Sequence, residues 1–364
     1  MAQPFHRAAA VAVCTVLVVA GSVGAASAAP TGSAATSAFV VGGGPWQPEF
    51  GFPGQHKLLT LPDDGFQTIY DFISSAHKSV DMTMYELDDT TVVADLIADV
   101  KRGVDVHVIL DGREGPGSPY YAPVEADLAA NGVHVVWSNP AYYFTHQKTI
   151  TVDGQVSLIM SGNLDSYYYS GDRDYAVFDN DPWDVHAIVQ TFNADFVYAP
   201  ITPSDGSGDL VWSPTDSQDK LLGLINGAHR SLYVEELEMD STPIINALVA
   251  ASKRGVDVHI VINADSEYTA AFNELAAAGV HISNSYTGSD TLYVHAKAIV
   301  ADYGSLDERF FVGSENWSDT SLNENRELGI ILPGWANQAD VNSLMKTFKA
   351  DFAAGVPYVP TATS

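Results

Sequence analysis

The sequence predicts an α/β protein made of two duplicated halves, each a mixed, largely parallel sheet flanked by helices. The main observation is internal repetition, because residues 101–107 recur without change at residues 253–259. Three further matches keep the same order, namely residues 76–79 with 228–231, 128–134 with 275–281, and 191–196 with 347–352. The chain is therefore a duplication of a unit of about 150 residues, a common size for one domain.

Hydrophobic periodicity gives matching elements in the two halves. The first half reads as helix 65–76, strand 80–85, helix 91–102, strand 104–110, helix 124–131 and strand 133–137. The second half reads as helix 243–254, strand 256–262, helix 270–278 and strand 280–282. Strands that alternate with helices favour a largely parallel sheet covered by helices.

The ends of the two halves follow from composition. Residues 1–28 have the charged, apolar and small-residue order of a secretory signal peptide, with cleavage expected near Ala28 and a secreted product. Residues 29–44 read as a flexible leader, 45–201 as the N-terminal half and 209–364 as the C-terminal half, with 202–208 as linker. Cys14 is the only cysteine, so the mature chain is expected to form no disulfide and to use no thiol nucleophile.

The charge balance limits the possible partners. The chain has 17 basic and 45 acidic residues, a net charge of −28. Such a protein repels polyanions, since non-specific nucleic-acid binding depends on Lys and Arg. We therefore expect no nucleic-acid partner, although an acidic surface also simply keeps an exported protein soluble.

One polar motif occurs once in each half. Its residues are His146, Lys148 and Asp153 in the first copy, and His295, Lys297 and Asp302 in the second. A short Ser-x-Asn element follows each motif and supplies Ser161, Asn163, Ser314 and Asn316. The intervening residues are β-branched or apolar, so we expect each His and Lys on a strand, where side chains two apart share a face. The two copies could then converge on one phosphate group, and one chain would suffice as a monomer.

These residue types suit displacement at a phosphodiester. Histidine can act as nucleophile or as proton donor because its pKa lies near the working pH. Lysine ammonium and asparagine amide groups can hold phosphoryl oxygens as donors. No metal and no cofactor is therefore expected. Four other repeated histidines are interpreted as packing residues because no Lys or Asn stands beside them: His107, His134, His259 and His281.

The paired motifs resemble those of the phospholipase D superfamily, whose signature is HxKxxxxD followed by Gly-Ser-x-Asn. The resemblance extends over nearly the whole mature chain and includes residues 210–214. The second copy matches the signature fully, whereas the first has Met160 in place of the glycine. The resemblance implies a pseudo-twofold fold and a two-step reaction through a phosphohistidine.

The resemblance also implies roles for the individual residues. His146 would be the nucleophile, and His295 would protonate the leaving alcohol and then activate the acceptor. Residues that would bind phosphoryl oxygens are Lys148, Lys297, Asn163, Asn316, Ser161 and Ser314. Asp174 and Glu327 would each orient an imidazole, while Asp153 and Asp302 would brace the site. The implied substrate is a glycerophospholipid met at a membrane surface, with water or an alcohol as acceptor.

Other functions remain open from the sequence. An exported nuclease would share the motifs, but no basic stripe accompanies them. A non-catalytic lipid-binding protein would be expected to have damaged motifs, and a metal-dependent hydrolase would need ligand spacing that is missing around His146 and His295. Aromatic residues at 142–144, 167–169 and 317 could line a headgroup pocket, meet a bilayer or pack in turns. Glu86 and Glu238 occupy equivalent positions without an assigned role.

Overall fold

The computed structural model describes residues 50–113, 121–287 and 292–360. The predicted signal peptide (1–28) and leader (29–44) lie outside these residues. Within the described parts of the chain, none of the helices combines the length and apolar character needed to cross a bilayer.

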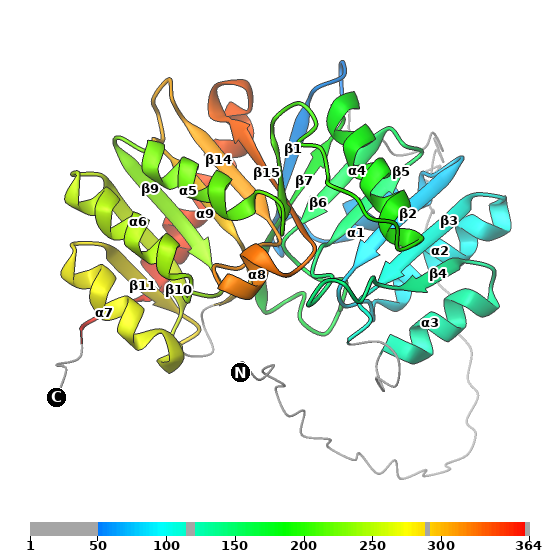
Figure 1. Ribbon diagram of the computed structural model, residues 1–364, viewed down its shortest axis with the longest axis horizontal. Helices are drawn as coiled ribbons and strands as arrows, with labels where there is room; N and C mark the ends of the chain where they lie inside the picture. The colour runs from blue at the N-terminus through cyan, green and yellow to red at the C-terminus, as the bar shows by residue number, and fades with distance from the viewer. Residues whose placement is uncertain (1–49, 114–120, 288–291, 361–364) are drawn as a thin grey trace, which may run out of the picture. The chain divides into compact units, whose positions relative to one another are not determined.

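The first half alternates strands and helices before it turns into antiparallel strands (Figure 1). Its elements are β1 (His56–Leu61), α1 (Gln67–Ser74), β2 (Ser79–Met84), α2 (Thr90–Arg102), β3 (Asp105–Leu110), α3 (Tyr121–Ala130), β4 (His134–Trp137), β5 (Thr149–Val152), β6 (Val156–Met160), β7 (Asp172–Asp179) and α4 (Pro182–Phe196).

The second half repeats this order and adds β12, α8, β16 and two 3-10 helices. Its elements are β8 (Leu210–Ser213), α5 (Ser217–Gly227), β9 (Ser231–Glu236), α6 (Thr242–Lys253), β10 (Asp257–Asn263), the 3-10 helix η1 (Ser266–Tyr268), α7 (Thr269–Ala277), β11 (His281–Ser285), β12 (Tyr293–Val294), β13 (Ala298–Ala301), β14 (Arg309–Gly313), α8 (Asp319–Asn323), β15 (Glu327–Pro333), the 3-10 helix η2 (Gly334–Ala336), α9 (Gln338–Ala354) and β16 (Val356–Pro357).

Two eight-stranded mixed sheets result, which confirms the predicted α/β fold in two halves. The first runs β1-β7-β6-β5-β2-β3-β4 with β12 paired to β7, and the second runs β16-β11-β10-β9-β13-β14-β15-β8. Both sheets are mixed: five pairs of the described strands are parallel, namely β2–β3, β3–β4, β9–β10, β10–β11 and β7–β12. The other nine pairs are antiparallel, so the parallel share is smaller than expected. Parallel neighbours need a helical crossover, whereas β5 reaches β6 through a short turn and must pair antiparallel.

Helix α2 shows how local sequence sets these elements. The carboxylate of Asp89 accepts the N–H groups of Thr91 and Val92, which caps the helix start. Val92 and Leu96 are fully buried at helical spacing. Gly103 ends the helix with φ 89°, a left-handed conformation that glycine adopts without strain.

The two halves share structure beyond their own cores. One apolar cluster lies in each half, and a third combines side chains of both, such as Tyr175 with Trp212 and Phe348. Strand β12 of the second half also joins the first sheet, where Tyr293 pairs with Asp172. This contact brings the second motif against the first half.

Candidate active site

Both motifs lie just before a strand rather than on it, which differs from the expected placement. His146 and Lys148 precede β5, and His295 and Lys297 lie between β12 and β13. The reason is that these segments bond to the opposite half. The N–H of His146 donates to the carbonyl of Arg326 at 2.9 Å, and the N–H of His295 donates to that of Arg173 at 3.1 Å.

Each histidine ring is held by a carboxylate of the other half. Nδ1 of His146 donates to Oε2 of Glu327 at 2.8 Å, and Nδ1 of His295 donates to Oδ1 of Asp174 at 3.0 Å. Glu327 is the first residue of β15 and follows Arg326, whose carbonyl binds the first motif. Asp174 lies near the start of β7 and follows Arg173, whose carbonyl binds the second motif. Because Nδ1 carries the proton toward the carboxylate, Nε2 of each ring is left as the reactive nitrogen.

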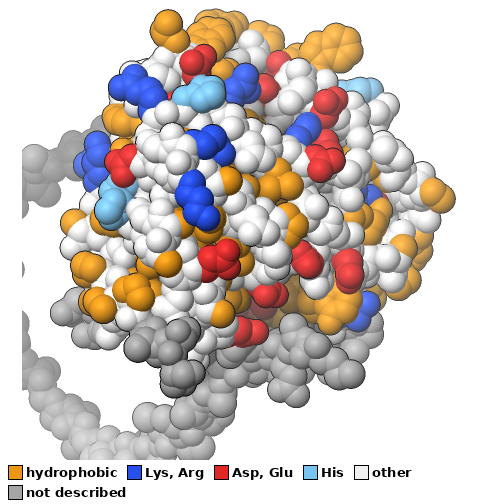
Figure 2. Space-filling model, turned by 60° about the vertical axis from the view of Figure 1, so that its left-hand side comes forward, with side chains coloured by type: hydrophobic (Ala, Val, Ile, Leu, Met, Phe, Trp, Pro, Cys, Tyr) orange, Lys and Arg blue, Asp and Glu red, His pale blue; other side chains and the backbone are white. Residues whose placement is uncertain are grey.

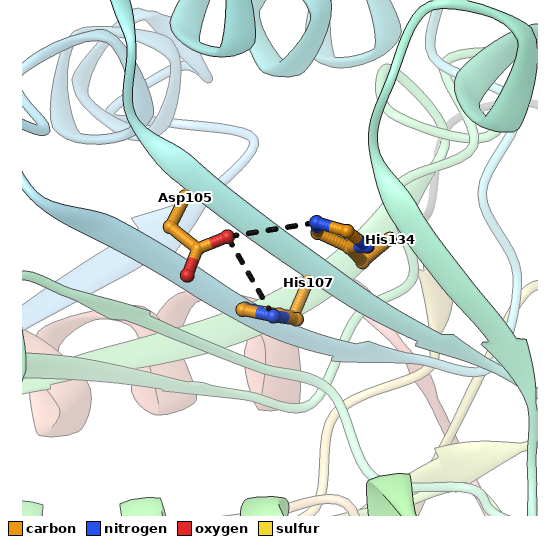
Figure 3. Close-up of side chains that lie close together, drawn as sticks. All are labelled: Asp105, His107 and His134. Atoms are coloured by element: carbon orange, nitrogen blue, oxygen red, sulfur yellow. Dashed lines mark ion pairs between the residues drawn. The ribbon is translucent and has the colours of Figure 1, made fainter.

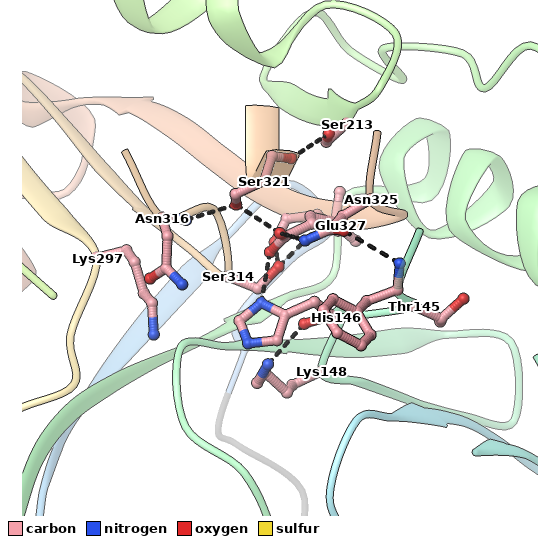
Figure 4. A network of polar contacts seen from close by, with 12 residues as sticks. Thr145, His146, Lys148, Ser213, Lys297, Ser314, Asn316, Ser321, Asn325 and Glu327 are labelled. Carbon is pink, nitrogen blue, oxygen red and sulfur yellow. Dashed lines mark hydrogen bonds and ion pairs between the residues drawn. The ribbon is translucent and has the colours of Figure 1, made fainter. Parts of the chain in front are cut away.

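The carboxylates are themselves fixed by further hydrogen bonds. Oε1 of Glu327 accepts Ser321 Oγ at 2.5 Å and Asn325 Nδ2 at 2.8 Å. Oδ1 of Asp174 accepts Ser161 Oγ at 2.6 Å. Figure 4 shows the network around His146 and Glu327. Ser321 and Asn325 carry no signal in the motif that would have marked them in the sequence.

Two buried lysines lie beside the histidines. Lys148 Nζ donates to the carbonyl of His146, and Lys297 Nζ to that of His295, each at 2.6 Å. Lys297 Nζ also approaches Nε2 of its own histidine at 3.5 Å. In Figure 4, the side chains of Lys148, Lys297 and Asn316 lie around the ring of His146. Residues of both motifs are therefore gathered at one place.

Burial and mutual repulsion shift the pKa values of the bases at this place. Burial lowers the pKa of His146 to about 4, against the opposing effect of Glu327. Burial, and then the charge of Lys297, lower the pKa of Lys148 to about 7. Burial and the charge of Lys297 also lower the pKa of His295. The site therefore favours a bound anion, which would relieve the repulsion among these bases.

The two carboxylates are shifted the opposite way. Burial alone would raise the pKa of Glu327 and of Asp174. The nearby histidine and lysine more than offset burial, so both pKa values are lowered. Both acids are therefore ionised and suited to stabilise an imidazolium.

The two asparagines are held by the pair of glutamates that had no assigned role. Asn163 Nδ2 donates to Glu86 Oε2 at 2.7 Å, and Asn316 Nδ2 donates to Glu238 Oε1 at 3.1 Å. An amide has two N–H bonds, so one remains for a substrate oxygen. Glu86 and Glu238 are thus positioning residues for the asparagines.

The two serines do not face a substrate. Ser161 is buried and its hydroxyl bonds to Asp174 and to the backbone of Tyr175. Ser314 is buried and its hydroxyl bonds to the backbone of Leu328. Their predicted part in phosphate binding is corrected, because the hydroxyls are engaged within the protein.

The motif aspartates lie away from the histidines. Asp153 follows β5, about 17 Å along the chain from Lys148 at ~3.3 Å per residue. Its carboxylate accepts the N–H groups of residues 77–79 at 2.7–3.1 Å, and Asp302 does the same for residues 229–231 at 2.6–3.2 Å. We expected these aspartates to brace the site, and they brace parts of the scaffold away from the histidines instead. They fix the turns that lead into β2 and β9, and this explains why the segment at 76–79 is repeated.

The aromatic side chains near the motifs are of three kinds: one that packs against the active-site histidine, some that are buried in the protein, and some that are exposed on the surface. Tyr85, which the sequence did not mark, packs edge-on to the His146 ring at 4.7 Å and lies 4.9 Å from Lys148 Nζ. Trp317 is fully buried, and Tyr142 hydrogen-bonds to Arg326. Tyr143 and Tyr167 are the exposed members of the set.

The arginines beside the carboxylates are neutralised by acids. Arg326 pairs with Asp195 at 2.9 Å, and Arg173 pairs with Asp351 at 2.6 Å and Asp63 at 2.8 Å. Asp195 and Asp351 are equivalent residues of the repeated segments 191–196 and 347–352, and each binds the arginine of the opposite half. Neither guanidinium is therefore left as a free cation for a polyanion.

The fold and this site define a protein in which two HxK motifs, one from each half, form a single centre. Two matches to the family model described as "Cardiolipin synthase, PLD-like domain" cover residues 69–198 and 221–353. The chain belongs to this family and, with it, to the phospholipase D superfamily.

Curated relatives agree with this assignment. The chain is 24% identical to a cardiolipin synthase of Geobacillus thermodenitrificans (strain NG80-2), over 84% of this chain and 68% of the relative. It is 25% identical to cardiolipin synthase C of Escherichia coli (strain K12), over 54% of this chain and 47% of the relative. The chain thus spans only part of these relatives.

Solved structures show the same fold at low identity. Phosphatidylserine synthase of Haemophilus influenzae Rd KW20 superposes with a TM-score of 0.66 at 11% identity, over 81% of this chain and 86% of that one. Polyphosphate kinase from Porphyromonas gingivalis also gives 0.66, at 14% identity, over 84% of this chain and 49% of that one.

Proposed function

We propose that this phospholipase D-superfamily phosphodiesterase acts on glycerophospholipids and transfers the phosphatidyl group, through a phosphohistidine, to an alcohol or to water. One observation carries the proposal. Two imidazoles, that of His146 buried and that of His295 partly buried, are each held at Nδ1 by a carboxylate of the opposite half and lie beside two buried lysines.

In the first step, Nε2 of His146 attacks phosphorus and the bond to the headgroup oxygen breaks. His295, protonated at Nε2, gives its proton to the leaving alkoxide. Glu327 stabilises the positive charge that develops on His146, since it already accepts Nδ1–H at 2.8 Å. Lys148, Lys297 and the free amide hydrogens of Asn163 and Asn316 bind the phosphoryl oxygens.

In the second step, His295 acts in reverse. Its Nε2 takes the proton of an incoming alcohol or water, whose oxygen attacks phosphorus. The bond from phosphorus to His146 then breaks, and the free imidazole returns. Asp174 holds His295 in the same tautomer through both steps.

Phospholipid is favoured over nucleic acid by charge and by the relatives. Arg173 and Arg326 are paired with acids, and the chain carries a net charge of −28. On the face shown in Figure 2, basic, acidic and apolar side chains are interspersed. The matched relatives are named cardiolipin synthases and a phosphatidylserine synthase, which favours an alcohol acceptor. Tyr167, 80% exposed, and Tyr143 are suited to brief contact with a lipid surface.

The place of action is proposed from the N-terminal sequence. The charged, apolar and small-residue order of residues 1–28 supports export and a secreted, mature protein. One chain holds both motifs at one centre, which supports action as a monomer.

The deciding experiment offers the purified mature chain three substrates in parallel, each with ethanol present: phosphatidylcholine, phosphatidylglycerol and single-stranded DNA. We expect phosphatidylethanol from a lipid, and cardiolipin from phosphatidylglycerol when ethanol is omitted. Cleavage of DNA alone would identify the nuclease instead. The absence of product from all three, with intact folding, would favour a binding protein on this scaffold.

A further inference from the structure

A cluster of two histidines and one aspartate lies on strands β3 and β4 of the first sheet (Figure 3). Asp105 and His107 share one face of β3 because they are two residues apart, and His134 of β4 is the register partner of His107. Asp105 Oδ1 lies 3.7 Å from His107 Nε2 and 3.8 Å from His134 Nε2. The active-site residues Tyr85 and Glu86 follow the other end of the neighbouring strand β2.

The second half contains the same cluster. Asp257 and His259 of β10 stand beside His281 of β11, again as register partners across a parallel pair. Asp257 Oδ1 lies 2.9 Å from His259 Nε2 and 3.9 Å from His281 Nε2. The two clusters therefore repeat one arrangement of three groups in two different surroundings.

These groups supply the ligand types of a transition-metal site. In each cluster, one ligand atom from each of the three residues lies within 4.8 Å of the other two. Ligand atoms ~2.0–2.1 Å from a tetrahedral ion are about 3.4 Å apart. The two imidazoles of each cluster are stacked, at interplanar angles of 21° and 29°, so the ring of His134 or His281 must turn to direct its Nε2 at the ion. His134 and His281 are 64% and 62% exposed at the side chain, so an ion and its water can reach them.

We propose that each cluster binds one divalent zinc-class ion through two imidazoles and one carboxylate. Imidazole nitrogens suit Zn²⁺, Cu²⁺ and Ni²⁺, whereas Ca²⁺ and Mg²⁺ prefer sets of oxygen ligands. The ion ties neighbouring parallel strands together and stabilises the fold. The proposal is independent of the phosphodiesterase reaction, which needs no ion at His146 and His295.

The two clusters differ beside their central histidine, and this difference predicts which of them binds the metal ion more tightly. Nδ1 of His107 lies 3.4 Å from Oδ1 of Asp81, its register partner on β2. A carboxylate at Nδ1 orients the ring and directs Nε2 toward the metal. The equivalent partner of His259 is Tyr233, which stacks on the ring at 5.5 Å and offers no carboxylate. The first cluster is therefore the tighter site.

The test is a Zn²⁺ titration of the tag-free mature chain at pH 7.5 by calorimetry, with thermal unfolding as a second readout. We expect two ions per chain and a rise in Tm, with no comparable response to Ca²⁺. His134→Ala and His281→Ala should each remove one site, and the double variant both. The matched control is His186→Ala, an exposed histidine outside the clusters, which should keep both sites.

The order of the two metal affinities is tested by substituting the residue that lies beside the central histidine of each cluster, Asp81 or Tyr233. Asp81→Asn should weaken the tighter site by about 10- to 100-fold, as loss of such partners does elsewhere. Tyr233→Asp should strengthen the weaker site. If the wild-type chain bound no Zn²⁺, or if the double variant bound it as the wild type does, the proposal would be overturned. Equal affinity at both clusters, unchanged in Asp81→Asn, would overturn the role of Asp81.

Discussion

Glu327 holds the Nδ1–H of His146 at 2.8 Å although 181 residues separate them in sequence. Asp174 and His295 repeat this contact in the opposite direction, at 3.0 Å. The centre is thus built from crossed pairs, and each half supplies the support for the other half's imidazole.

Loss of either histidine should stop turnover. His146→Ala and His295→Ala are each expected to lower kcat by at least ~10³-fold, because a nucleophile and its proton donor act as one unit. Headgroup release from phosphatidylglycerol measures this. His186→Ala should keep the wild-type rate, and near-normal turnover in either active-site variant would show that the two motifs do not share one reaction.

The crossed carboxylates should control tautomer rather than binding. Glu327→Gln and Asp174→Asn keep the shape but can hold the wrong tautomer, so kcat should fall by about 10²- to 10⁴-fold with little change in KM. Steady-state kinetics on vesicles separates the two parameters. A rise in KM alone would instead assign these acids to substrate binding.

The pH profile of kcat/KM should be bell-shaped, since it reports the free enzyme. His146 must be neutral to attack, and its lowered pKa of about 4 places the acid limb there. His295 must be protonated at Nε2 to serve the leaving group, and burial and the charge of Lys297 lower its pKa. It therefore loses its proton before Lys148, whose pKa is lowered to about 7, and sets the basic limb. Lys148→Arg cannot lose its proton and should leave the basic limb in place. A basic limb that moved upward in this variant would assign it to Lys148.

Glu315 should make stability depend on pH. Its side chain is fully buried, and burial raises its pKa well above 4.5. The pKa of Glu315 is higher in the folded chain than in the unfolded chain. The free energy of unfolding is therefore at its full value below about pH 4.5 and falls as the pH rises toward the pKa of the folded state. Relative to wild type, Glu315→Gln should gain ~1.4 kcal/mol per pH unit over that window.

Urea unfolding at pH 5 and pH 8 measures this difference. The matched control is Glu267→Gln at an exposed position, which should change stability equally at the two pH values. If Glu315→Gln behaved like that control, the buried carboxyl would have to be ionised in the folded protein.

The buried ion pairs between the halves should matter for stability. Arg326→Met leaves the carboxylate of Asp195 buried without its partner, and we expect a loss of about 3–5 kcal/mol in the free energy of unfolding. Asp195→Asn combined with Arg326→Met should recover part of that loss. Denaturant unfolding of the single and double variants measures the coupling. Strict additivity would show that the pair contributes nothing.

The repeats and motifs predicted much of this protein. They gave the two halves, several helices and strands, and the histidines and lysines that come together. The repeats did not show that each imidazole is held by a carboxylate of the other half. A repeat identifies equivalent residues, but it does not say whether they make contacts within one half or between the two halves. The equivalence of Asp195 with Asp351 was visible, but its partners Arg326 and Arg173 were not.

Two kinds of residue were placed wrongly or missed for physical reasons. Asp153 and Asp302 belong to the motif by spacing, yet a four-residue strand carries them to the far end of the sheet. The repeated segment at residues 76–79 was the signal that could have located them. Tyr85 was missed because the second copy has Leu237 there, so the repeat does not mark it.

The carboxylate–imidazole contacts between the two halves also limit which substitutions the protein can accept. Each half has its own apolar core, yet a substitution that moves Glu327 can be compensated only near His146, in the other copy. A chain with one copy would have to find the missing acid and arginine partner on a second molecule. When the two copies lie on one chain, they are always made in equal amounts. The contacting residues of the two copies must also change together, so neither copy can diverge far without a matching change in the other.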